Sequence, residues 1–120
     1  MTLGPGFDIE AAARRMNAEN RKEDERARLR RLEAREEAAR LVYRLRARDP
    51  ALRRVWGFGS VFDESRPFSM DSDIDLAIEG GDILKLVSET EGSCFKVDLI
   101  DITDSTDAFA ALVREHGTLL

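Results

Sequence analysis

The feature that most limits the fold is a stretch from Ile9 to Arg48 that contains neither proline nor glycine. Ala, Arg, Glu and Leu dominate it, and because these residues favour helix, the stretch predicts one long helix. Asp8 is placed to cap the helix start. Pro50 disfavours a helical conformation in the residue before it, so we expect the helix to end there. The chain should therefore consist of a helical element and one small domain.

The predicted helix differs along its length. Residues 17–28 hold almost nothing apolar, whereas an apolar stripe able to dock on a domain is formed further on by Ala38, Leu41, Val42 and Leu45. A partial second stripe is formed by Leu29, Leu32, Ala39 and Tyr43. Solvent is expected to surround the charged residues Glu33, Arg35, Glu37 and Arg40. No heptad repeat is sustained, so we expect a projecting arm over residues 1–49 whose last turns pack on the domain or on a second subunit.

Residues 50–120 read as the globular domain, with a loop over 60–72 and no internal repeat. Three strands are expected at Arg54–Phe58, Ile74–Ile78 and Phe95–Ile102. A short helix should follow an Asp82 cap and end at Gly92, and a last helix should open at Thr103 or Ser105 and close at Gly117, with an inner face of Phe109, Leu112 and Val113. This order predicts an α/β (α+β) domain with a small sheet and flanking helices.

Charge is unevenly distributed along the chain. Segment 14–54 carries 15 Lys and Arg against 8 Asp and Glu, whereas the remaining residues carry 4 against 16. Such an acidic half would repel phosphates unless cations bind there. The N-terminal stretch lacks the basic start and the following apolar run of a signal peptide, and no apolar run is long enough to span a bilayer. We therefore expect a cytoplasmic protein. The single cysteine, Cys94, excludes an internal disulfide and is expected to be half-buried.

Carboxylates recur on two of the predicted strands. Alternate strand residues face one side, so Asp73 and Asp75 should point together while Ile74 and Leu76 enter the core. Two adjacent carboxylates repel unless they share a proton or a cation, and a divalent ion with oxygen ligands is the simplest partner. On the third strand Asp98 and Asp101 have opposite parity, so only one can join the pair. A third carboxylate would complete a site for two ions about 3.5–4 Å apart.

A Gly-Ser turn follows the first strand. Gly59 lets the backbone approach a ligand closely, and Ser60 with its neighbouring amides can hold phosphate oxygens. Alone, the dipeptide is a weak signal for a phosphate site. Together with the carboxylates it becomes a specific combination.

These motifs resemble those of the minimal nucleotidyltransferases, within the DNA polymerase beta-like superfamily: a strand ending in Gly-Ser, a spacer, Asp-x-Asp, and a later Val-Asp-Leu strand. Here they read Phe58-Gly59-Ser60, Ser72-Asp73-Ile74-Asp75-Leu76 and Val97-Asp98-Leu99. The resemblance covers roughly residues 52–120. The spacer is slightly longer than is usual in the family, and a shorter one would end on Asp71-Ser72-Asp73; the core register of Ile74 and Leu76 favours Asp73 and Asp75.

The resemblance implies a small mixed sheet and a set of roles. Gly59 and Ser60 would hold the nucleotide phosphates, Asp73, Asp75 and Asp98 would bind two Mg²⁺ ions, and Asp98 is also a possible base. Arg66, the nearest cation after the Gly-Ser turn, is expected to join Gly59 and Ser60 in binding the nucleotide. The acids Asp63 and Glu64 stand in the turn where a basic residue is usual in the family.

The implied activity is transfer of a nucleotide, AMP from ATP in the first instance, to a hydroxyl on a partner protein. Such domains are commonly antitoxins paired with HEPN ribonuclease toxins. One alternative is a catalytically weak or inactive antitoxin that acts by contact, favoured by the altered loop after Ser60. Another is a structural role in which the helix drives homo-oligomer assembly. The basic helix could also meet an acidic partner, RNA or the acidic domain of a second subunit. His116 and Trp56 are expected at the surface and in the core, respectively.

Overall fold

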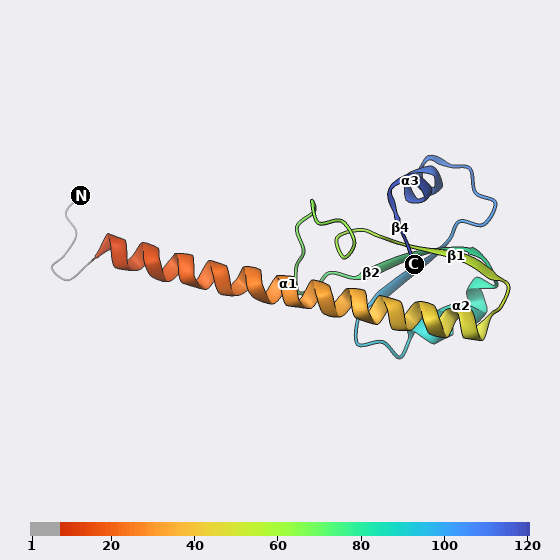
Figure 1. Ribbon diagram of the computed structural model, residues 1–120, viewed down its shortest axis with the longest axis horizontal. Coiled ribbons are helices and arrows are strands. Elements are labelled where there is room, and N and C mark those ends of the chain that lie inside the picture. Colours follow the sequence, from red (N-terminus) through yellow and green to blue (C-terminus); the bar gives the residue numbers. More distant parts are fainter. Residues whose placement is uncertain (1–7) are drawn as a thin grey trace.

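The computed structural model describes residues 8–120, and the lead-in containing Gly4, Pro5 and Gly6 lies outside that range. Helix α1, Ile9–Arg48, is confirmed along its full predicted length. The Asp8 side chain accepts a hydrogen bond from the Ala11 N–H at 3.1 Å and caps the start. The first half of α1 projects from the molecule, and only its second half lies against the domain (Figure 1). No helix in residues 8–120 has the length and apolar character that crossing a membrane requires.

The domain is built on a mixed four-stranded sheet with the order β3-β2-β1-β4. Its strands are β1 (Leu52–Phe58), β2 (Ile74–Gly80), β3 (Val97–Asp101) and β4 (Thr118–Leu119). Strands β2 and β3 are parallel, and the other pairs are antiparallel. Helices α2 (Ile83–Thr90) and α3 (Ala108–His116) flank the sheet, which confirms the predicted fold class. Strand β4 was not predicted, because two residues carry no periodicity.

Opposite faces of the sheet are covered by different helices (Figure 1). Leu76 and Ile78 of β2 form the larger core together with the α1 stripe, in which Leu41 and Leu45 are fully buried, and with α2. The opposite face, the α3 face, carries a smaller core made by Trp56, Ala77, Ile102, Ala110 and Val113. The predicted α1 docking stripe and the buried Trp56 are therefore confirmed. The α3 face is the one that presents the alternate, polar residues of β2.

One prediction about α1 is wrong. Glu37 is buried rather than solvent-facing, because it accepts hydrogen bonds from the Ser93 hydroxyl at 2.9 Å and from Arg40 at 3.2 Å. Although burial acts to raise it, these hydrogen bonds hold the pKa of Glu37 below its ordinary value. The partial second stripe does not dock, since its residues Leu29, Leu32, Ala39 and Tyr43 are exposed. Cys94 is also exposed rather than half-buried.

Helix α3 begins later than predicted. Its cap is Asp107, which accepts a hydrogen bond from the Ala110 N–H at 2.7 Å. Thr103 has a different role, because its hydroxyl accepts from the Gly80 N–H at 2.8 Å and so joins the β3 end to β2. The predicted inner face is confirmed only at Val113, which is buried together with Ala110, whereas Phe109 and Leu112 are 41% and 57% exposed. The rotation of α3 leaves apolar side chains open beside the sheet.

Candidate functional site

The three predicted carboxylates lie together at one end of the β2–β3 pair. Asp75 is directly opposite Asp98 in the parallel register, on the α3 face. Asp73 lies just before β2 and is close enough for its charge to act on Asp75. Asp101 is exposed and accepts a hydrogen bond from the Thr103 N–H at 2.9 Å, so it takes no part in this group. The alternation of side chains along the strand allowed either Asp98 or Asp101 to be the third carboxylate of this group. In the structure it is Asp98.

The electrostatics of the group oppose full ionisation. Burial, followed by the negative charges of Asp98 and Asp73, raises the pKa of Asp75 to about 6, and only Arg66 acts in the opposite direction. All the donors are hard carboxylate oxygens, the kind that Mg²⁺ and Mn²⁺ prefer. In residues 8–120 no three acidic, His or Cys side chains already converge as ligands, so the carboxylates would have to rotate toward an ion. Their chemistry and mutual repulsion fit such an ion, since it would supply the missing positive charge.

Gly59 joins the Gly-Ser turn to the carboxylates. Its φ of +75° lies in the left-handed region that favours glycine, and a Cβ at this position would overlap the Oδ2 of Asp75. Ser60 follows, half-buried, in a single turn closed by the Asp63 N–H donating to the Gly59 carbonyl at 3.0 Å. The Gly59 backbone therefore passes directly against Asp75, and the two sequence motifs form one site.

The loop after this turn, residues 60–72, is held by arginines of α1. Arg35 donates to the Val61 carbonyl at 2.8 Å, and Arg31 donates to the Arg66 carbonyl at 2.7 Å. The Arg31 guanidinium also lies over the Phe68 ring, 5.3 Å from its centroid. Part of the basic helix surface thus binds the loop of its own domain. These contacts were not predicted, because they join positions far apart in the chain.

The two acidic residues after Ser60 have partners within the loop. Asp63 accepts from the Ser65 hydroxyl at 2.6 Å and the Ser65 N–H at 3.0 Å, and these bonds hold its pKa below the ordinary value. Glu64 pairs with Arg35 at 3.4 Å. Both carboxylates therefore help to shape the loop, and neither is aimed freely at the carboxylate site.

The other candidates are placed as follows. Asp71 is exposed in a turn and is not among the groups that act on Asp75, which favours the Asp73 and Asp75 register. Asp73 pairs with Lys96 at 3.6 Å, a cation that was not predicted to lie at the site. Arg66 does lie near the site, since its charge acts on Asp75.

A cleft of about 470 Å³ opens beside Gly59, between the 60–66 part of the loop and α3. Its walls include Phe58, Phe109 and Leu112, and Arg66 and His116 also border it. His116 is exposed, as predicted, at the end of α3. The cleft was not predicted from the sequence, because it depends on how α3 is rotated against the sheet.

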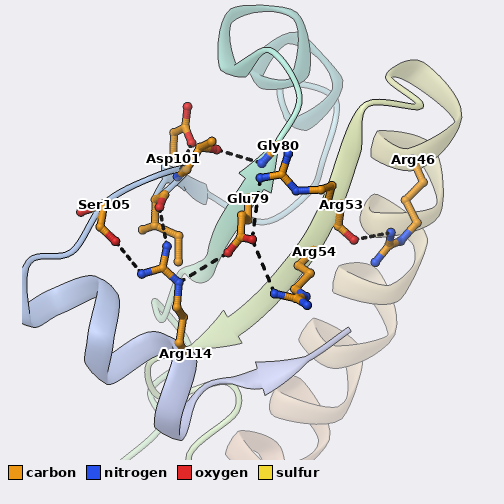
Figure 2. Close-up of polar contacts among 10 residues, drawn as sticks. Arg46, Arg53, Arg54, Glu79, Gly80, Asp101, Ser105 and Arg114 are labelled. Atoms are coloured by element: carbon orange, nitrogen blue, oxygen red, sulfur yellow. Dashed lines mark hydrogen bonds and ion pairs between the residues drawn. The ribbon is translucent and has the colours of Figure 1, made fainter.

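A second polar cluster lies at the opposite end of β2, on the same sheet face (Figure 2). Glu79 is contacted by Arg114 at 3.4 Å, Arg54 at 3.5 Å and Arg53 at 3.8 Å. Arg114 also donates to the carbonyls of Ser105 at 2.6 Å and Ile102 at 2.8 Å. Here the carboxylate is surrounded by cations from the protein itself, an arrangement typical of a structural ion-pair network.

No protein-family model matches the chain, and searches of curated proteins and of solved structures give no significant match. The function must therefore be argued from the residues and their geometry.

Proposed function

We propose that this protein is a metal-dependent nucleotidyltransferase that transfers a nucleotide, AMP from ATP in the first instance, to an acceptor hydroxyl. The observation that carries the proposal is the contact of the Gly59 backbone with Asp75, which itself lies opposite Asp98. The Gly-Ser turn, of a kind that can bind phosphate, and the acidic group, which calls for a cation, thus lie in one site.

The proposed roles follow from the side chains. Asp73, Asp75 and Asp98 would hold the metal, while the hydroxyl and the backbone N–H of Ser60 would hold the triphosphate. When bound, two Mg²⁺ ions would activate the attacking oxygen and stabilise the charge on the leaving pyrophosphate. Arg66, whose charge reaches Asp75, is placed to attract the phosphates to the same spot. Lys96 would be released from Asp73 as the metal takes its place.

The transfer step exchanges one phosphorus–oxygen bond for another. The acceptor oxygen bonds to the α-phosphorus while the bond from that phosphorus to the pyrophosphate oxygen breaks. The acceptor hydroxyl loses its proton to a base, and Asp98 is the proposed recipient. Its position beside Asp75 at the open end of the strands favours this assignment.

The domain is small, so the proposed acceptor is held by, or belongs to, a partner protein. Following the family resemblance, we propose a toxin–antitoxin pair in which the partner is a HEPN-type toxin. The projecting half of α1 is the proposed contact element, either for that partner or for a second copy of the chain (Figure 1). Removing residues 1–28 would test the second option while keeping Arg31, Arg35 and the buried stripe. An unchanged oligomeric state would show that the projecting half does not drive assembly.

Radiolabel transfer tests the activity directly. The full chain, Mg²⁺ and the product of the neighbouring gene are incubated with ATP labelled at the α- or the γ-phosphorus. We expect the α-label, and not the γ-label, to become attached to protein, since pyrophosphate leaves. Asp75→Asn should abolish labelling, whereas Asp71→Asn, at an exposed position outside the group, should not.

Two outcomes would contradict the proposal. Transfer that survives Asp75→Asn would show that another site carries the chemistry. No transfer, with a stable complex that Asp75→Asn leaves intact, would favour the alternative function of an antitoxin acting by contact. Asp63 and Glu64 at the border of the cleft are the features that favour this alternative.

A further inference from the structure

The cleft beside Gly59 has no role in the transfer step described above. Resting on the proposed nucleotidyltransferase function, we propose that this cleft binds the nucleotide base, held mainly by stacking. The phosphates would lie at the carboxylate site. The cleft would then add to the affinity of the enzyme for the whole nucleotide.

Continuity between the cleft and the carboxylates is the first support. Gly59 borders the cleft and also lies against the Asp75 carboxylate. Arg66 borders the cleft too, and its charge acts on Asp75. One ligand could therefore contact the carboxylates and the cleft at the same time.

The composition of the cleft indicates which end of the ligand enters it. Asp63 and Glu64 lie on its border and would repel a triphosphate placed inside. Apolar side chains from both β1 and α3 line the cleft as well, among them Phe58, Phe109 and Leu112. The charged end of a nucleotide thus belongs at Gly59 and Arg66, and the base belongs in the cleft.

The aromatic side chains offer a surface that fits a planar base. The rings of Phe58 and Phe109 meet edge to face, with centroids 5.4 Å apart and planes at 78°. A base stacked on one ring would meet the edge of the other, a favourable arrangement for π systems. Phe109 and Leu112 remain 41% and 57% exposed, so apolar surface is left open for a ligand to cover. At about 470 Å³, the cleft lies within the range typical of small-molecule sites, roughly 300–1,000 Å³.

Comparing ATP with tripolyphosphate tests the inference, because only ATP carries a base. Calorimetric titration would give the dissociation constants of both magnesium complexes for the wild type, for Phe109→Ala and for Leu112→Ala. We expect the wild type to bind ATP more tightly than tripolyphosphate, and Phe109→Ala to weaken ATP binding roughly 10-fold without changing tripolyphosphate binding. Leu112→Ala should act in the same direction with less risk to folding. Leu84→Ala, at a residue of α2 that is 84% exposed, is the matched control.

The outcomes separate this inference from the proposed function. If ATP and tripolyphosphate bind equally, or if neither cleft variant changes ATP binding, the base does not occupy the cleft although the phosphate site exists. If neither compound binds the wild type, the nucleotidyltransferase proposal fails and the inference fails with it. Thermal melting of Phe109→Ala would show whether a loss of ATP binding reflects unfolding.

Discussion

Strand β2 carries two carboxylates on one face, at Asp75 and Glu79, and their surroundings are opposite. Glu79 is contacted by three arginines at 3.4–3.8 Å (Figure 2). Asp75 instead faces two further carboxylates, and the charge of Arg66 offsets only part of the rise in its pKa. The strand is the same, and the sheet face is the same. The difference therefore lies in what the neighbouring elements contribute.

This comparison shows how a structural carboxylate differs from one kept for a ligand. At Glu79 the fold supplies the compensating charges itself, through β1 and α3. At Asp75 it adds like charge and removes water, which makes the ionised form costly. A perturbed carboxyl group with charged neighbours in an accessible position is typical of functional sites. The uncompensated end of β2 is thus the end at which we expect an external cation.

The largest expected effect is on divalent-ion affinity. Replacing Asp73 and Asp75 together by Asn removes two of the three anionic oxygen donors, so Mn²⁺ affinity measured by calorimetry should fall roughly 100-fold or more. Glu79→Gln should leave the affinity unchanged, because that carboxylate already has protein partners. An equal loss of Mn²⁺ affinity in both variants, or no loss in the Asp73 and Asp75 double variant, would contradict the distinction between the two ends of β2.

The next largest effect is on folding stability, and it is expected for substitution of Glu79. Glu79→Ala leaves the half-buried Arg114 and its neighbours without their counter-charge, so the free energy of unfolding should fall by about 2 kcal/mol. Urea denaturation would measure it. Glu36→Ala, at an exposed position of α1, is the control and should change stability by no more than about 0.5 kcal/mol. A loss at Glu79 no larger than that of the control would show that the arginine cluster is not structural.

In metal-free protein, Asp75→Asn should raise the free energy of unfolding, whereas Glu79→Ala lowers it. The folded-state pKa of Asp75 is raised to about 6, so its contribution to stability is present at low pH and is lost as the pH rises through that value. Asn avoids this loss. After allowance for solvent screening, the variant should be more stable by about 1 kcal/mol at pH 8 and nearly equal to the wild type at pH 4.

Thermal melts in EDTA across this pH range would measure the difference. Adding Mg²⁺ should stabilise the wild type and not the variant, since ligand binding to the folded state raises its stability. A variant that is less stable than the wild type at pH 8 in EDTA would show that the negative charge of Asp75 is structurally required.

Of the two ends of β2, only the carboxylate group around Asp75 was predicted from the sequence. The period of two along a strand was enough to place Asp73 and Asp75 together and to separate Asp98 from Asp101. Likewise, the Asp8 and Asp82 caps follow from local chemistry and were predicted correctly. These features depend on residues close in the chain.

The rest depends on how elements pack, which no local pattern encodes. Arg35 reaches the Val61 carbonyl only because α1 crosses the sheet at a particular angle. Phe109 appeared to belong to the inner face of its helix, but the small Ala110 allows α3 to pack closely on Trp56 and turns Phe109 outward. The cleft follows from that rotation, so neither it nor the arginine contacts could be predicted from spacing alone.

The smallest expected effect concerns the outer arginines of the Glu79 cluster. Arg54 is 60% exposed and contacts Glu79 at 3.5 Å, a geometry in which water screens most of the attraction. Arg54→Ala should therefore lower the free energy of unfolding by about 0.5 kcal/mol or less. Adding 1 M NaCl to the denaturation experiment should reduce even that difference, because the Debye length falls to about 3 Å. A cost close to that of Glu79→Ala would mean that compensation depends on Arg54 rather than on the less exposed Arg114, and the account of this end of β2 would have to change.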